Sequence, residues 1–258
     1  MTLVGMVIIL ASTFLGLTMS GINPVGVFLD IPSIVIVVGG TIGATMAGGT
    51  IKDAVGGFKA ALRAFLGGKG NDATEAVKQL LGFADTARRE GLLALESSVN
   101  DVEDDFVRRG LQLAVDGTDP EVVREILETE VDSLQARHKQ GAGTFVAAAG
   151  YGPAFGVAGT VCGLIDMLGK LEDPSTLGPA MAVAFTTTLW GVFIANYICL
   201  PIAGKLKRAS ELEVAFRLMI IEGILSIQAG TNPRALSDKL STYLAPSERG
   251  ALEDKKSA

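Results

Sequence analysis

The stretch FVAAAGYGPAFGVAGTVCGLIDML, residues 145–168, decides the fold of this chain. It is 24 residues long and carries one charged side chain, Asp166. A helix needs about 20 mostly apolar residues to cross the hydrocarbon core of a bilayer. The stretch therefore predicts a membrane-spanning helix over Phe145–Leu168.

Three further apolar runs of similar composition lie at Leu3–Met19, Ile31–Ala47 and Pro179–Ala203. The first run could be a signal peptide. However, no Lys or Arg precedes it and a second run follows almost at once, so we expect it to be retained. The segment 52–140 is as charged as a soluble domain. We predict an all-α membrane protein with four transmembrane helices and a cytoplasmic helical domain inserted between the second and third.

The composition supports a membrane protein and excludes several other classes. Only 19% of the 258 residues are charged, against about 25% in an average soluble domain, and the mean hydropathy is +0.41. The net charge of −6 argues against a nucleic-acid partner. Cys162 and Cys199 both lie inside predicted spans, and His138 is the single histidine. We therefore expect no disulfide framework, no metal site and no His-based catalytic cluster.

Basic residues predict the orientation. The insert is rich in Lys and Arg, and the tail after the fourth run begins with KLKR at 205–208. The connection Ser20–Asp30 has no basic residue, and Gly169–Gly178 has only Lys170. By the positive-inside rule, both termini and the insert are expected in the cytoplasm.

These boundaries divide the chain into four parts. Residues 1–50 hold transmembrane helices 1 and 2, and 145–204 hold helices 3 and 4. Residues 51–144 form a cytoplasmic interface helix and a helical domain, and 205–258 form a cytoplasmic helical tail. The interface helix is predicted within Thr50–Leu66, because its apolar residues recur at helical spacing, although a soluble helix would show the same period.

The rest of the insert predicts several short helices after a break at Gly67–Asn71. Their expected ranges are Ala73–Arg89, Leu92–Val99, Asp101–Val115 and Pro120–His138. Asp119 is a suitable N-cap for the last helix, with Pro120 at its first position. This helix could continue into the third span as one rod.

Glycine spacing predicts close packing of the spans. Gly39 and Gly43 are four residues apart in the second run, and Gly152 and Gly156 repeat this spacing in the third, with Gly159 and Gly163 alongside. Since helices in lipid attract one another through close approach over small residues, we expect tight contacts within or between subunits.

Few ionisable groups lie in the predicted spans. Asp30 and Asp166 are near outer ends, and no carboxylate lies at mid-membrane. If the chain moves ions, the titrating group therefore comes from another polypeptide. The polar groups at depth are the hydroxyls of Thr160 and Thr186–Thr188. Such oxygens suit a partly dehydrated Na⁺, although a threonine can instead bond back to its own helix.

Two other features carry alternative interpretations. Pro153 and Pro201 each leave one backbone carbonyl without its helical hydrogen bond. Either the proline only kinks the helix, or the freed carbonyl lines a cavity. In the insert, Arg88, Arg89 and Glu96 flank the apolar stretch Leu92–Leu95. They form either a solvated charged face or a docking surface for an acidic or mixed-charge partner.

Seven segments, in order along the chain, carry a family resemblance. They are FLDIPSIVIVVGGT (28–41), ARREGLLALE (87–96), VDGTDPEVVRE (115–125), RHKQGAGTF (137–145), GPAFGVAGTVCGLIDML (152–168), LGPAMAVAFTTTLWG (177–191) and IQAGTNPR (227–234). Together they resemble the flagellar stator subunits of the MotA/PomA family over nearly the whole chain. The resemblance implies four membrane helices and a homopentamer around a dimer of a MotB/PomB-like subunit. That partner binds peptidoglycan and supplies the ion-carrying aspartate.

The resemblance also implies roles for individual residues. Arg88 and Glu96 match the charged pair that engages the rotor protein FliG, and Arg89 replaces a lysine. Asp166 matches no acidic position of the family. The implied ion pathway uses an acidic residue near the entrance, hydroxyls associated with sodium-driven stators and two prolines linked to ion flow and torque. These residues are Asp30, Thr160, Thr187, Thr188, Pro153 and Pro201.

We therefore expect a flagellar stator subunit, not an enzyme, in the bacterial inner membrane. With its partner it would conduct Na⁺, or H⁺, and turn ion flow into rotor rotation through FliG. Membrane lipid is an expected contact, and no cofactor is expected. One alternative is an ExbB/TolQ-type motor subunit that energises envelope transport, but such subunits usually have three spans with the insert after the first. Another is an inverted-repeat transporter, but the two halves show no matching breaks.

Overall fold

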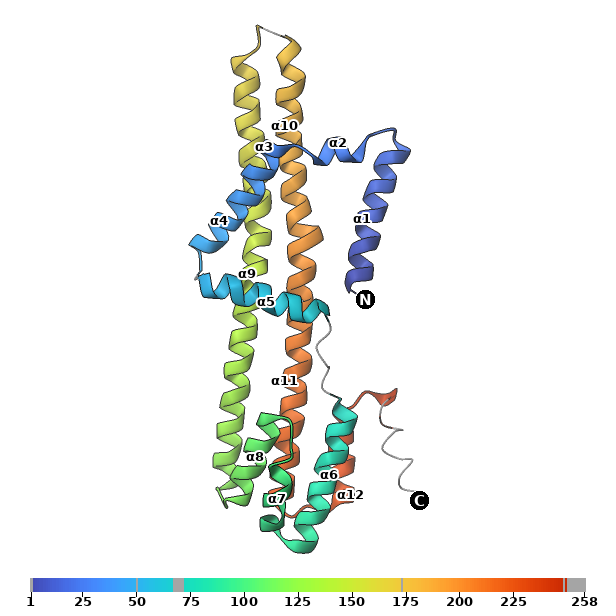
Figure 1. Ribbon diagram of the computed structural model, residues 1–258, viewed down its shortest axis with the longest axis vertical. Helices are drawn as coiled ribbons and strands as arrows, with labels where there is room; N and C mark the ends of the chain where they lie inside the picture. The colour runs from blue at the N-terminus through green and yellow to red at the C-terminus, as the bar shows by residue number, and fades with distance from the viewer. Residues whose placement is uncertain (1, 50, 67–71, 173, 248, 250–258) are drawn as a thin grey trace. The chain divides into compact units, whose positions relative to one another are not determined.

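The computed structural model describes residues 2–49, 51–66, 72–172, 174–247 and 249, and every regular element in these ranges is a helix (Figure 1). The predicted all-helical class is therefore confirmed. The chain divides into two compact units. Unit 1 contains Met1–Gly68 and His138–Ala209, and unit 2 contains Lys69–Arg137 and Ser210–Ala258. The predicted break at Gly67–Asn71 lies outside the described residues.

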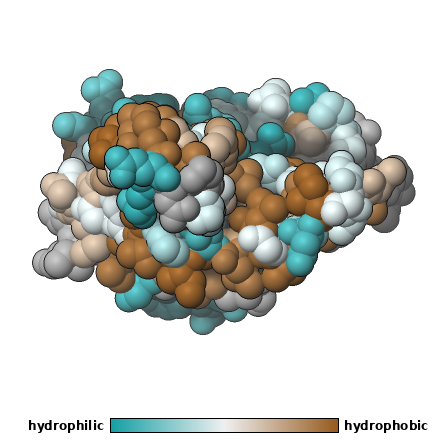
Figure 2. Space-filling model, turned by 90° about the horizontal axis from the view of Figure 1, so that it is seen from above, coloured by the Kyte–Doolittle hydropathy of each residue, from teal (hydrophilic) through white to brown (hydrophobic). Residues whose placement is uncertain are grey.

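The helices of unit 1 follow the apolar runs of the sequence. The first two runs and their connection form α1 (Thr2–Met19), α2 (Pro24–Phe28), α3 (Ile31–Ile34), the π-helical turn η1 (Val35–Gly39) and α4 (Gly40–Ala47). Two helices, Pro120–Gly169 and Ser175–Gln228, are long and apolar enough to cross a bilayer, whereas Val4–Met19 and Ile31–Ala47 are shorter apolar helices. Many aliphatic side chains of these helices are exposed, and Figure 2 shows apolar surface on the face seen from above.

Two helices are longer than the predicted spans. α9 (Pro120–Gly169) joins the predicted helix Pro120–His138 to the third run without interruption. The carboxylate of Asp119 accepts a hydrogen bond from the Glu121 amide at 2.8 Å, which is the predicted N-cap. The fourth run continues past Ala203, because α10 (Pro174–Phe193), the π-helical turn η3 (Ile194–Cys199) and α11 (Leu200–Gln228) follow one another directly.

A glycine seam joins α9 to α10. A Cβ added at Gly156 would lie 3.0 Å from the Thr187 carbonyl oxygen, and one at Gly163 would lie 2.9 Å from the Ala184 Cβ. On the α10 side, a Cβ at Gly191 would lie 2.7 Å from the Gly152 carbonyl oxygen. The close packing predicted for the glycines of the third run is therefore confirmed within one chain.

The predicted glycine pair of the second run makes no close contact within the described chain, and its packing between subunits stays a prediction. A Cβ added at Gly39 or Gly43 would meet no atom within 4 Å, whereas one at Gly40 would lie 2.4 Å from the Phe155 ring. Within the chain, the close approach to α9 is therefore made at Gly40. Which glycine is used depends on which face of the helix meets α9, and residue spacing does not contain that information.

The amphipathic segment is also a helix, α5 (Ile51–Leu66), as predicted. The face of α5 that carries the small residues Gly57 and Ala61 packs on α9. A Cβ at Gly57 would lie 3.0 Å from the Gly141 carbonyl oxygen, and Ala61 is buried. Phe58 on the same helix is exposed.

Unit 2 is a helical domain with its own hydrophobic core. Its helices are α6 (Ala73–Glu90), the 3₁₀ turn η2 (Leu92–Leu95), α7 (Glu96–Val99), α8 (Asp105–Val115), α12 (Pro233–Ser241) and the adjoining parts of α9 and α11. The core includes Leu80, Leu95, Leu111, Leu127, Ile220, Ile224 and Leu236, all fully buried. The predicted helix Asp101–Val115 begins only at Asp105, so its predicted start was wrong. The Asp104 carboxylate accepts from the Phe106 amide at 2.8 Å and caps the helix there.

Candidate functional site

Thr160 and Thr188 form the centre of the first candidate site. The seam brings their helices together, and their hydroxyls hydrogen-bond to each other although 28 residues separate them. The Thr160 hydroxyl also lies 3.0 Å from the Gly156 carbonyl oxygen and 2.9 Å from the Ala184 carbonyl oxygen. Two hydroxyl and two carbonyl oxygens therefore converge. Neutral oxygen donors of this kind suit a small hard cation.

Thr187 lies in the seam, away from this hydroxyl pair. It is fully buried, and its methyl-bearing side chain faces Gly159, where an added Cβ would lie 2.6 Å from it. Its hydroxyl donates to the Ala184 carbonyl oxygen at 2.8 Å. The back-bonding alternative therefore describes Thr187, whose contacts are those of a packing residue, whereas Thr160 bonds both back to Gly156 of its own helix and across to Ala184 and Thr188.

The hydroxyl pair lies on the side of the α9–α10 hairpin that the second run does not cover. The Ser33 hydroxyl donates to the Val183 carbonyl oxygen at 3.3 Å, and the Trp190 indole donates to the Phe28 carbonyl oxygen at 3.1 Å. At about 100° per residue, Thr188 points about 140–160° away from Val183 and Trp190.

Pro153 lies on the same side as Thr160, because seven residues of α9 bring a side chain back to within about 20°. This side, called here the open flank, consists of four residues on each helix. They are Pro153, Val157, Thr160 and Leu164 on α9, and Met181, Phe185, Thr188 and Val192 on α10. Val157, Leu164, Met181, Phe185 and Val192 are exposed aliphatic or aromatic side chains. The open flank is thus an apolar surface with two hydroxyls.

Asp30 does not join the hydroxyl pair within one chain. Its carboxylate accepts from the Ser33 amide at 3.0 Å and caps α3. Its chain neighbours Phe28 and Ser33 both contact the opposite side of α10. Asp30 therefore caps its own helix within one chain, and its predicted place near the ion entrance stays a prediction.

Pro201 is the second residue after the π-helical turn of the fourth run. A proline inside a helix removes an amide donor and crowds the carbonyl four residues earlier. Here the turn widens just before it, and the Leu200 amide bonds to the Ala195 carbonyl, five residues back. The wider turn relieves the crowding, so the helix continues through Pro201 without a break. Pro153 is likewise accommodated inside α9.

Asp166, unexplained by the sequence, pairs with Lys170 at 2.8 Å one helical turn away. Six residues separate it from Thr160, so it points about 120° away from that hydroxyl. Acid and base four residues apart on a helix are a recognisable signal, and both side chains are exposed. The pair is a surface contact outside the open flank.

The second candidate site lies in unit 2, at the end of α6. Arg88, Arg89, Glu90 and Glu96 are exposed around η2. Arg89 pairs with Asp85 at 3.0 Å. Within the part of the chain that the structure describes, Arg88 and Glu96 have no ion-pair partner.

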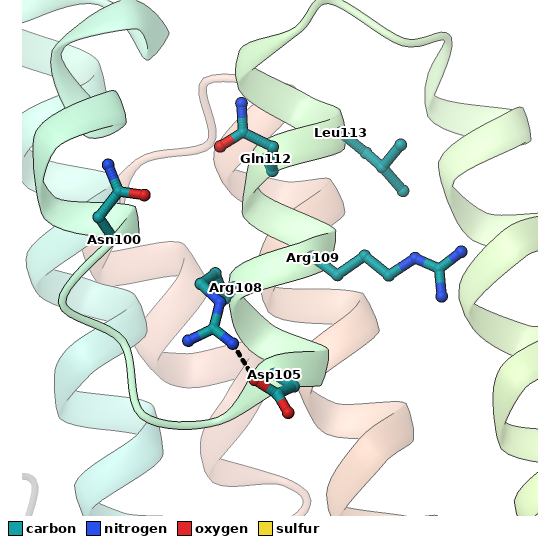
Figure 3. Close-up of a pocket in the computed structure, with 6 residues that line it drawn as sticks. All are labelled: Asn100, Asp105, Arg108, Arg109, Gln112 and Leu113. Atoms are coloured by element: carbon teal, nitrogen blue, oxygen red, sulfur yellow. Dashed lines mark hydrogen bonds and ion pairs between the residues drawn. The ribbon is translucent and has the colours of Figure 1, made fainter.

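A polar groove on α8, not found from the sequence, lies nearby (Figure 3). It is lined by Asn100, Asp105, Arg108, Arg109, Gln112 and Leu113. The Asn100 amide donates to the Glu96 carbonyl oxygen at 3.2 Å, so the groove adjoins the second site. Arg108 is bonded to Asp105, and Arg109 pairs with Glu130 at 3.2 Å. Its charges are therefore largely matched within the chain.

Comparison with known proteins identifies the family. Residues 98–218 match the model of the MotA/TolQ/ExbB proton channel family. Motility protein A of Borreliella burgdorferi is 43% identical over 88% of this chain and 87% of its own length. Chemotaxis protein PomA of Vibrio alginolyticus is 38% identical over 98% and 97%. The chain belongs to the MotA/TolQ/ExbB family.

Solved structures agree with this assignment. The flagellar MotAB stator complex from Bacillus subtilis contains a chain with a TM-score of 0.88 and 36% identity, covering 96% of this chain and 97% of that one. The corresponding chain of C. jejuni MotAB has a TM-score of 0.90 and 33% identity, covering 95% of each. As a family member related to motility protein A, this chain is a flagellar stator subunit of an ion channel and not an enzyme. The prediction of a stator subunit is confirmed over the ExbB/TolQ alternative.

The structure shows a cluster of aromatic side chains between the first helix and α10 that the sequence did not indicate. Phe14, Phe28, Trp190, Phe193 and Tyr197 form a chain of ring contacts with centroids 4.7–5.9 Å apart. The Thr13 and Tyr197 hydroxyls are 2.9 Å apart and join α1 to η3. These residues attach the first helix to the side of α10 opposite the open flank.

Proposed function

We propose that five copies of this chain surround a dimer of a MotB/PomB-like subunit in the bacterial inner membrane and that the complex conducts Na⁺. Each chain crosses the membrane four times, through 1–50 and 145–204. Residues 51–144, 205–258 and both termini lie in the cytoplasm. The distribution of basic residues supports this orientation, and the solved relatives are MotAB complexes.

The observation that carries the proposal is the hydroxyl pair on the open flank. An ion that crosses beside Thr160 and Thr188 exchanges part of its water shell for hydroxyl and carbonyl oxygens. A sodium ion needs such a set of oxygens, whereas a proton does not. The open flank as defined contains no carboxylate, so the titrating group belongs to the partner helix that packs on this surface. The apolar side chains around the hydroxyls are suited to cover such a helix.

The mechanism follows from charge neutralisation. The ion binds the partner's aspartate, driven by about 2.3 kcal/mol per charge for each 100 mV of membrane potential. Once it is neutral, the aspartate no longer binds best to the open flank that it faces. The ring of subunits therefore rotates until the open flank of the next subunit faces the aspartate. Pro153, packed on Gly191, and Pro201, after the π-helical turn, are the points at which the two helices adjust. The exposed charges Arg88, Arg89 and Glu96 pass the rotation to FliG.

A swimming assay tests the proposal. The chain and its partner are expressed in bacteria that lack their own stators, and external Na⁺ is varied at fixed pH. Thr188→Ala is expected to lower swimming speed at limiting Na⁺, and Thr188→Ser, which keeps the hydroxyl, to restore most of it. Thr18→Ala is the control, because Thr18 is an exposed hydroxyl that bonds only to its own helix at 2.8 Å. Unchanged Na⁺ dependence in Thr188→Ala would contradict the ion assignment, and a swimming speed that does not change with external Na⁺ would assign H⁺.

A further inference from the structure

Leu93, in the segment between the charged residues of unit 2, is unusually exposed. It is 74% exposed, whereas Leu95, in the same 3₁₀ turn, is fully buried. Leu92 also packs against the core of unit 2. The turn is therefore fixed through its neighbours while Leu93 faces solvent. One exposed leucine carries little information by itself, so the backbone that presents it has to be considered.

Gly91 holds the turn in a conformation that essentially only glycine adopts. Its φ is 89° and its ψ is 164°. No atom lies within 4 Å of the position of an added Cβ, so glycine is required by the backbone and not by close packing. The Gly91 amide donates to the Ala87 carbonyl at 2.9 Å and ends α6, and its carbonyl accepts from the Ala94 amide at 3.2 Å. Unusual backbone conformations of this kind gather at functional sites.

Charges of opposite sign lie on the two sides of Leu93. Arg88 precedes the turn, and Glu96 follows it. Both side chains are available, since neither is in an ion pair of the described chain, whereas Arg89 is held by Asp85. At protein interfaces, a few buried residues near the centre supply most of the affinity, while rim charges set orientation and association rate.

We propose that Leu93 is the apolar anchor of the rotor-contact surface. It inserts into an apolar pocket of the rotor protein, and Arg88 and Glu96 pair with an acidic and a basic rotor side chain on either side of that pocket. This inference rests on the proposed rotor contact and adds to it the residue that provides the affinity. Along the chain the surface presents a basic, an apolar and an acidic side chain, so the rotor surface that fits it has an acidic side chain, an apolar pocket and a basic side chain in the matching order.

The test measures binding of purified FliG to the intact stator complex in lipid nanodiscs at two NaCl concentrations. Leu93→Ala is expected to raise the Kd about tenfold or more. The factor is expected to be the same at both concentrations, because salt does not screen an apolar contact. Arg88→Ala is expected to weaken binding mainly at low salt. Leu93→Met, which keeps the apolar bulk, should restore most of the affinity.

Leu212→Ala is the matched control, because Leu212 is 63% exposed in the same unit but lies on α11. It should leave the Kd unchanged. All variants should keep the unfolding temperature of the complex, since the altered side chains are exposed.

Three outcomes would overturn parts of the proposal. Normal binding by Leu93→Ala together with weak binding by Arg88→Glu would remove the anchor and keep the rotor contact. Normal binding by Leu93→Ala, Arg88→Glu and Glu96→Lys would remove the rotor contact itself. A change of subunit number in Leu93→Ala, measured by mass photometry, would assign Leu93 to an interface between copies and overturn the anchor.

Discussion

Replacing Gly191 by alanine would separate α9 from α10 at the level of the hydroxyl pair. The added Cβ would lie 2.7 Å from the Gly152 carbonyl oxygen, 3.1 Å from the Pro153 Cα and 3.2 Å from the Gly152 carbonyl carbon. All three are backbone atoms, so no side chain can rotate away. Normal contacts need about 3.5 Å, and the helices must therefore part by roughly 0.5–1 Å.

The cost has two components. Overpacking of a tight contact costs typically 1–3 kcal/mol, and a gap of 0.5–1 Å forfeits about a quarter to a half of each neighbouring dispersion contact. In addition, Thr188 lies about one turn from Gly191 and bonds to Thr160 across the same two helices, so this hydrogen bond stretches, with a loss of about 1 kcal/mol. We expect Gly191→Ala to destabilise the complex by about 2–4 kcal/mol in total and to reduce ion flow.

The assay combines thermal unfolding of the purified complex with Na⁺-driven swimming. Gly150→Ala is the control, since Gly150 lies in α9, the other helix of the seam, but an added Cβ there meets no atom within 4 Å. It should be neutral or slightly stabilising, because alanine favours helix by up to about 1 kcal/mol over glycine. If Gly191→Ala unfolds and swims like the unsubstituted protein, the seam does not position the hydroxyls and the reasoning is refuted.

Three further substitutions test other parts of the structure. Asp30→Asn should keep unfolding temperature and swimming, because asparagine caps equally well, whereas Asp30→Ala should cost about 1 kcal/mol; loss of swimming in Asp30→Asn would give the charge a role in ion entry. Arg217→Ala should lower thermal stability by roughly 1.5–3 kcal/mol, because Arg217 is 17% exposed, donates to Asp104 at 2.7 Å and lies 4.8 Å over the Phe106 ring; an unchanged unfolding temperature would contradict this. Leu95→Ala should cost about 2–5 kcal/mol, measured by the same unfolding assay, and wild-type stability would show that η2 is not held by the core.

Features that depend on local sequence were predictable. Apolar runs gave the long helices, and Asp119 before Pro120 gave the start of α9. The start of α8 was placed too early because several acidic residues in 101–105 can cap a helix. The structure selects Asp104, whose carboxylate also accepts from Arg217, a residue 113 positions away. A contact so distant along the chain leaves no trace in local spacing.

The roles of adjacent threonines could not be separated from the sequence. Thr187 and Thr188 point about 100° apart on α10, so one enters the seam and the other reaches the open flank. Which of the two enters the seam depends on where α9 packs against α10, and the sequence does not specify this. For the same reason the sequence does not show which side of α10 the segment around Asp30 contacts, and the structure places that contact opposite the open flank.

The surroundings of Thr160 have a consequence for how fast an ion would pass along the proposed pathway. Its hydroxyl has one proton but three oxygens within reach, those of Gly156, Ala184 and Thr188. The proton can therefore occupy several arrangements of similar energy, which differ only by rotation about the C–O bond. Turning the proton away exposes a lone pair to an arriving cation, and turning it back releases the cation. In the proposed ion pathway, no helix or bulky side chain would have to move for this exchange, so we expect the hydroxyl to release an ion as readily as it binds one.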